Sequence, residues 1–154
     1  MQTETMKLRE LTVRYGVMKD SDGQPVVIGR HLSVPKDAAA AFMTTLQDEP
    51  AEVFAMICLT TKHRVIAYHE VSRGTLDATL VHPREVFKAA LLVNAATIIV
   101  AHVHPSSGDP TPSPDDIELT RRLAAAGEIL GVQLLDHIII GDGRYYSFKE
   151  AGRI

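Results

Sequence analysis

Two histidines at the end of an apolar segment, with a Ser/Gly/Pro-rich loop behind them, are the residues best suited to chemistry in this sequence. His102 and His104 lie one residue apart, and on a strand residues i and i+2 project to the same face. After the loop, Ser113 and Pro114 suit the start of a helix, which places Asp116 in its first turn. The loop can therefore return the Asp116 carboxylate toward the two imidazoles. A His/His/Asp set with one open position is typical of a catalytic zinc site, so we predict one zinc ion per chain.

A metal site of this kind also needs a base for its water. Zinc lowers the pKa of bound water to about 7, and a carboxylate at the mouth of a neighbouring strand can then accept the proton. Glu52 begins an apolar run shortly after Pro50 and is placed for this role. Glu70 also lies on an expected strand, and the sequence alone leaves both carboxylates as candidates.

Each of these residues has a purely structural interpretation as well. The histidine pair could be a polar strand end, and Ser113 could be only a helix N-cap, worth about 1 kcal/mol. Asp116 could be a first-turn acid favoured by the helix dipole. A cap fixes the position of a hydroxyl, so the structural and chemical roles of Ser113 are compatible.

The elements that must position these residues alternate between strands and helices. Helices are expected over residues 35–47, 83–95 and 114–130, and strands over 52–59, 64–71, 97–102 and 132–140, with an Asp-Gly hairpin over 141–148. Residues 7–17 alternate loosely like an edge strand, and a turn over 20–26 leads to a further strand over 26–28, so a hairpin or meander is expected to open the domain. We predict an α/β fold with a central mixed β-sheet flanked by helices.

Composition limits the class of protein. A chain of 154 residues with 45% hydrophobic and 23% charged residues suits one domain over 1–154, with N-terminal strands and a helix over 1–48 and a core over 49–154. The net charge of -3 gives no strong nucleic-acid signal. The single cysteine, Cys58, excludes an intramolecular disulfide, and we expect a cytoplasmic protein without a signal peptide or membrane segment.

The array of Glu52, His102-x-His104-Pro105 and Ser113-x-x-Asp116 resembles the JAMM motif of the JAB/MPN metalloprotease superfamily. Three further segments resemble its RadC-type branch, namely GTLDATLVHPREVFKAAL, HPSSGDPTPSPDD and LLDHIIIGDGRYYSF. The resemblance implies a three-layer, cytidine-deaminase-like architecture. It also implies that His102, His104 and Asp116 are zinc ligands, that Glu52 is the acid/base and that Ser113 steadies the oxyanion.

The sequence departs from the family pattern at two places. The loop between His104 and Ser113 has eight residues, one more than the family motif, and the extra residue lies within positions 106–108. We keep Ser113 and Asp116 in their roles, because the other register would place Thr111 or Pro112 at the serine position. Val103 stands where the RadC branch usually carries Asn, and it should face away from the metal.

Two functions from different classes follow from this resemblance. The first is a zinc-dependent hydrolase of peptide or isopeptide bonds that acts on a peptide or protein substrate. The alternative is a non-catalytic MPN scaffold associated with DNA repair or a mobile genetic element. For this alternative, an association with DNA is implied only by the resemblance to the family. RadC-type proteins usually carry an N-terminal helix-hairpin-helix region, in place of which strands are expected here. A nuclease is a weaker third option, and one cysteine cannot supply the Cys-x-x-Cys pair of zinc nucleoside deaminases.

Two other residues have expected structural roles. His137 follows Asp136 in an apolar run, so it is expected to be a satisfied core residue or to support the metal ligands. Cys58 is expected to be a small core hydrophobe.

Overall fold

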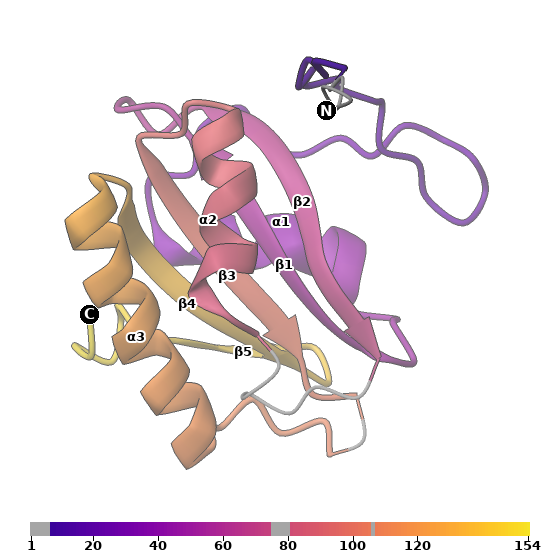
Figure 1. Cartoon of the computed structure of the whole chain (residues 1–154). Helices are drawn as coiled ribbons and strands as arrows, with labels where there is room; N and C mark the ends of the chain where they lie inside the picture. Colours follow the sequence, from indigo (N-terminus) through magenta and orange to yellow (C-terminus); the bar gives the residue numbers. More distant parts are fainter. Residues whose placement is uncertain (1–6, 75–80, 106) are drawn as a thin grey trace, which may run out of the picture.

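The computed structural model describes residues 7–74, 81–105 and 107–154. Eight elements follow one another along the chain: α1 (Pro35–Leu46), β1 (Glu52–Leu59), β2 (Val65–Gly74), α2 (Pro83–Leu92), β3 (Thr97–Val103), α3 (Pro114–Leu130), β4 (Gln133–Gly141) and β5 (Arg144–Ser147) (Figure 1). Residues 75–80 of the RadC-like segment and position 106 of the site loop lie outside this description. The predicted α/β class with a mixed sheet is confirmed.

The sheet places β3 at its centre, in the order β2-β1-β3-β4-β5. β1 pairs antiparallel with β2 and β3, β3 pairs parallel with β4, and β4 pairs antiparallel with β5. All seven residues of β3 are buried, which agrees with the apolar run over residues 98–101 in the middle of the strand. The parallel pair requires a crossover, and α3 provides it. The end of β3 and the beginning of α3 are thus joined only by the loop over residues 104–113.

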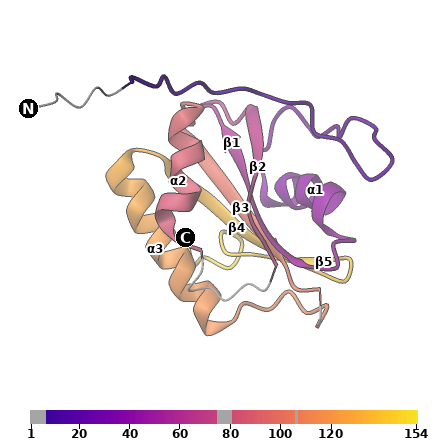
Figure 2. The ribbon, with the colours of Figure 1, turned by 45° about the vertical axis from the view of Figure 1, so that its right-hand side comes forward.

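Helices cover both faces of the sheet and make three layers (Figure 2). Alternate residues of β1 face opposite sides: Ala55 and Ile57 pack in the same cluster as Phe42 of α1. Phe54 and Met56 instead pack in the cluster that contains residues of α2 and α3. The sheet therefore has two hydrophobic cores, and a side chain's position along a strand decides which one it enters.

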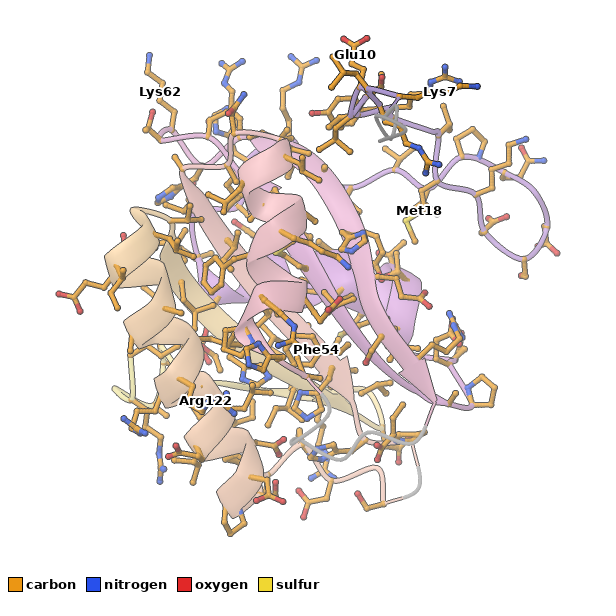
Figure 3. All side chains as sticks on the ribbon, viewed as in Figure 1. Lys7, Glu10, Met18, Phe54, Lys62 and Arg122 are labelled. Atoms are coloured by element: carbon orange, nitrogen blue, oxygen red, sulfur yellow. The ribbon has the colours of Figure 1, made fainter. Side chains whose placement is uncertain are left out.

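The predicted N-terminal strands are wrong. Within the described residues no strand precedes α1, and that region contributes only isolated bridges, between Lys19 and Pro25 and between His31 and Arg64. The predicted turn does form, with the Asp20 carboxylate accepting hydrogen bonds from two backbone N–H groups. Alternating apolar residues make a strand only where another strand pairs with them, and here they stay exposed. The segment carrying Lys7, Glu10 and Met18 runs outside the sheet (Figure 3).

The described part of the chain contains no helix with the length and apolar character needed to cross a membrane.

A close backbone contact fixes the loop that follows β3. Gly141, at the end of β4, lies against Gly108 so closely that a Cβ at position 141 would overlap the Gly108 carbonyl group and come within 2.9 Å of the nitrogen of Pro110. Gly108 itself has a φ of +62°, which favours glycine. The loop and the strand end can therefore approach only because both positions lack a side chain.

Gly141→Ala should lower the free energy of unfolding by about 1–3 kcal/mol, because the methyl group forces the loop away from β4. Urea denaturation followed by circular dichroism would measure the change. Gly16→Ala is the matched control, since a Cβ there meets nothing within 4 Å, and it should stay within about 0.5 kcal/mol of the wild type. Equal stability of the two variants would contradict the assigned contact.

Candidate metal centre

The end of β3 and the first turn of α3 bring three potential ligands together. His102, His104 and Asp116 each offer one ligand atom, and these atoms all lie within 4.8 Å of one another. The two Nε2 atoms are 2.9 Å apart. Asp116 Oδ1 lies 3.2 Å from His102 Nε2, and Oδ2 lies 3.4 Å from His104 Nε2. The predicted convergence of the three side chains is confirmed.

These spacings suit a small tetrahedral ion. Ligand atoms about 2.0–2.1 Å from a tetrahedral metal are roughly 3.3 Å from one another, from simple geometry. The measured separations of 2.9, 3.2 and 3.4 Å lie close to that value. Two imidazoles and one carboxylate leave a fourth position open, as catalytic metal sites require. The three residues could therefore bind one metal ion.

Asp116 is held in place by the helix that it begins. Its Oδ2 accepts a hydrogen bond from the backbone N–H of Ser113 at 2.8 Å, and its own N–H donates to Ser113 Oγ at 3.1 Å, which completes a capping box. Burial would raise the pKa of Asp116, but its interactions with the rings of His102 and His104 outweigh burial and hold the pKa well below its ordinary value. Asp116 is thus a carboxylate throughout the neutral range.

His104 is the more accessible of the two histidines and carries a proton more readily than an ordinary imidazole. Its hydrogen bond with Asp116 raises its pKa most, burial opposes this, and the Asp109 carbonyl and the charge of Glu52 add to the increase. The Nδ1–H of His104 donates to the backbone oxygen of Asp109 at 2.8 Å, which turns Nε2 toward Asp116. A proton and a metal ion would therefore compete for His104 Nε2.

The two candidate bases lie on opposite faces of the sheet. Phe54 pairs with His102 in the β1–β3 register, and their rings stack with centroids 5.9 Å apart. Glu52 lies two residues before Phe54 and so shares the face of the histidines. Its charge also contributes to the raised pKa of His104, which places it near the centre.

Glu70, in contrast, lies opposite Ala55, whose side chain belongs to the α1 face. It is exposed and forms an ion pair with Arg73 at 2.7 Å, and Arg73 also binds Glu49. This placement supports Glu52 over Glu70 as the base, a role that remains a prediction.

Ser113 is the exposed N-cap residue of α3, and its backbone N–H and side chain both bond to Asp116. Its Oγ accepts from the Asp116 N–H, a bond that uses a lone pair and leaves the hydroxyl hydrogen available for donation. The cap and the predicted oxyanion role are therefore compatible in geometry.

The remaining predicted residues take structural positions. Val103 packs in the α1-side cluster, away from the ligands, as predicted. Cys58 is a buried core residue, and burial raises the pKa of its thiol to about 11. Asp136 faces the C-terminal turn, where its carboxylate accepts from Ser147 Oγ and from the N–H of Lys149, while His137 faces His102.

Two groups that contact the histidine ligands directly are not predicted by the sequence. One is the backbone oxygen of Asp109, for which a side-chain pattern gives no signal. The other is Phe54, whose stacking on His102 depends on the register between β1 and β3. The apolar alternation of β1 predicted the face of Phe54 but not its partner.

The fold and the site together define a class of protein: an α/β domain with a His/His/Asp centre at the end of its middle strand. Comparison with known proteins is more specific: residues 32–153 match the family described as the RadC-like JAB domain. The chain belongs to this family. The predicted resemblance to RadC-type domains is confirmed.

Related proteins share the name "UPF0758 protein". One from Methanosarcina acetivorans is 47% identical over 123 residues, which is 80% of this chain and 53% of that protein. One from Desulfitobacterium hafniense is 43% identical over 148 residues, or 96% of this chain and 65% of that protein, and one from Desulforamulus reducens is 50% identical over 120 residues. The chain spans about half to two thirds of the length of these relatives.

Protein purified without chelator should contain about one divalent transition-metal ion per chain, because the donor set is assembled by the fold. His102→Ala and Asp116→Ala should each lose nearly all of it in elemental analysis. His31→Ala is the control, since His31 is exposed and lies outside the ligand set, and its metal content should match the wild type. Retention of wild-type metal content by both site variants would contradict the ligand assignment.

The metal-free and metal-loaded forms should respond oppositely as pH rises above about 6.5, the unfolded pKa of histidine. The pKa of His104 is raised in the folded protein. Protonated His104 therefore stabilises the metal-free form fully below about pH 6.5, the pKa of histidine in the unfolded chain, and this stabilisation is lost as pH rises. The pKa of Asp116 is lowered, so the stability that Asp116 contributes changes with pH only near and below about pH 4. Burial lowers the pKa of His69 and of His137, so these two residues change the stability of the folded protein only at pH values below about 6.5.

Metal binding displaces the His104 proton, so the metal-loaded form should instead become more stable as pH rises. Melting temperatures measured with and without saturating zinc would show the two slopes. His104→Gln should remove the downward slope of the metal-free form, and parallel slopes in the wild type would contradict the proton–metal competition.

Proposed function

We propose that this domain is a zinc-dependent hydrolase of peptide or isopeptide bonds. The observation that carries the proposal is the convergence of His102, His104 and Asp116 with an open fourth position, on the sheet face that also holds Glu52. Nitrogen and oxygen donors at tetrahedral spacing favour zinc. Membership of the RadC-like JAB domain family supports the same chemistry.

Each protein group has a task in this reaction. A bound zinc ion would act as a Lewis acid and lower the pKa of water to about 7. Glu52 accepts the proton of the attacking water as the new C–O bond forms, and then returns it to the amine nitrogen as the C–N bond breaks. Ser113 donates its hydroxyl hydrogen to the carbonyl oxygen while that oxygen carries negative charge. Water is consumed and one carboxylic acid and one amine are produced.

The centre is open to solvent at His104, whose side chain is 19% exposed. A cavity of about 520 Å³ borders His104 and is lined by the loop between α1 and β1, by Pro105 and Gly108, and by Asp142. Asp48 and Glu49 are also in its wall. Glu49 in this wall is paired with Arg73, and the cavity adjoins the metal centre through His104.

Glu52→Gln should abolish hydrolysis while zinc content stays near the wild-type level, because the amide keeps the side-chain shape and cannot accept a proton. The rate would be measured on a randomised library of internally quenched peptides and on a quenched substrate joined through a lysine Nε isopeptide bond. A loss of at least about 100-fold is expected for removal of a general base.

Glu70→Gln is the matched control, because Glu70 contacts Arg73 and lies on the other face of the sheet. It should retain the wild-type rate. Loss of activity in Glu70→Gln with an active Glu52→Gln would assign the base to Glu70. Zinc-loaded wild type that cleaves neither kind of substrate would overturn the hydrolase and favour the non-catalytic scaffold associated with DNA repair or a mobile genetic element.

A further inference from the structure

A line of buried hydrogen bonds runs behind the candidate metal centre, from β3 through β4 to α3. His102 Nδ1 lies 2.9 Å from His137 Nε2, and His137 Nδ1 lies 2.6 Å from Thr120 Oγ1. Thr120 Oγ1 in turn donates to the backbone oxygen of Asp116 at 2.6 Å. His137 and Thr120 are 0% and 2% exposed, so water does not compete for these bonds. The line begins at one candidate ligand and ends at the backbone of another.

The acceptor at the end of the line determines the direction of every bond in it. A carbonyl oxygen has no hydrogen, so the single hydrogen of Thr120 Oγ1 must point to Asp116 O. Thr120 Oγ1 can then only accept from His137, which places the hydrogen of that imidazole on Nδ1. The His137 ring packs against Phe54 and Phe148, and its hydrogen-bond partners among the described residues include no carboxylate. It is therefore a neutral imidazole with one N–H, and its Nε2 is bare. It therefore accepts from His102 Nδ1–H.

From this geometry we propose that Thr120 and His137 are positioning residues that hold His102 in the tautomer with a hydrogen on Nδ1 and a bare Nε2. The bare Nε2 is the atom that faces His104 and Asp116, so it is ready to bind a metal without first losing a hydrogen. This inference rests on the proposed metal centre but is independent of whether the centre hydrolyses peptides.

Aromatic stacking keeps both rings of the line in the required orientation. His137 stacks on Phe148 with centroids 5.0 Å apart and planes at 9°, and His102 stacks on Phe54 with planes at 13°. A flip of either ring would exchange nitrogen and carbon positions and break the line. His104 needs no such line, because its Nδ1 donates directly to the Asp109 carbonyl oxygen. Hydrogen bonds thus connect both ligands to a backbone oxygen. His104 bonds to that of Asp109 directly, and His102 is connected to that of Asp116 through the side chains of His137 and Thr120.

The first test reads the tautomer in the wild type. Two-bond ¹H–¹⁵N correlation spectra of the metal-free protein, with histidines assigned by substitution, report which ring nitrogen carries hydrogen. His102 should show the Nδ1–H pattern and His137 the same pattern. A His102 with a bare Nδ1 and a hydrogen on Nε2 would overturn the proposal, and this result requires no variant to fold.

The second test separates the hydroxyl from its volume. Thr120→Val keeps the shape and removes the donor, so zinc affinity measured by competition with a chromophoric chelator should fall about 10- to 100-fold, and the His102 signal should shift toward the Nε2–H form. Thr120→Ser keeps the hydroxyl and should bind zinc within about threefold of the wild type, a small change compared with loss of an outer-shell partner. Equal zinc affinity of the Val and Ser variants would overturn the proposal.

Ser147→Ala controls for stability alone. Ser147 Oγ is also a buried hydroxyl, and it donates to Asp136 at 2.6 Å on the other side of β4, with no bond to His102. Its loss should lower the melting temperature and leave zinc affinity unchanged. A drop in zinc affinity as large as that of Thr120→Val would show that lost stability explains both, and would overturn the assigned role. None of these measurements uses hydrolysis, so an inactive domain with the expected affinities would refute only the proposed activity.

Discussion

One buried carboxylate is shared between the N-terminus of α3 and the two histidines of β3, and the arrangement of the centre depends on it. Burial of a charge is costly unless it is paired and hydrogen-bonded, and Asp116 meets both conditions. The capping bond uses Oδ2, while Oδ1 points toward His102. The helix cap therefore places Asp116 without any help from a metal. A ligand that is positioned by backbone hydrogen bonds is prepared before the ion arrives, which lowers the cost of binding.

The central position of β3 explains why groups from four elements can meet at its end. β1 lies on one side and presents the face that holds Glu52 and Phe54, while β4 lies on the other side and presents His137. The parallel β3–β4 pair makes α3 begin near the same sheet edge, because the crossover starts where β3 ends. A histidine pair on an edge strand would have one neighbouring strand only. The mixed sheet thus supplies both a candidate base and an outer hydrogen-bond partner.

The sequence predicted those parts that depend on local pattern and failed where pairing decides. β1 and α3 have the predicted bounds, because an unbroken apolar run and a Ser-Pro start are strong signals. Residues 7–17 alternate as a strand does, yet alternation does not supply a partner. The choice between Glu52 and Glu70 needed the β1–β2 register, which shifts between Phe54 and Ala55 and so determines the face that Glu70 takes. Thr120 meets His137 through helix-to-sheet packing, which no spacing in the sequence encodes.

The extra residue in the loop between His104 and Ser113 is compatible with the centre, because both ends of the loop are fixed independently of its length. The N–H of His104 donates to the oxygen of Ile140 on β4, which continues the β3–β4 ladder past the strand end. At the other end, Ser113 is fixed by the α3 cap. Between them, the N–H of Gly108 donates to the oxygen of His104 at 3.1 Å. The carbonyl of Asp109, which follows this bond, reaches His104 Nδ1. Ligand geometry is set by the strand and the helix, and the loop needs only to span them.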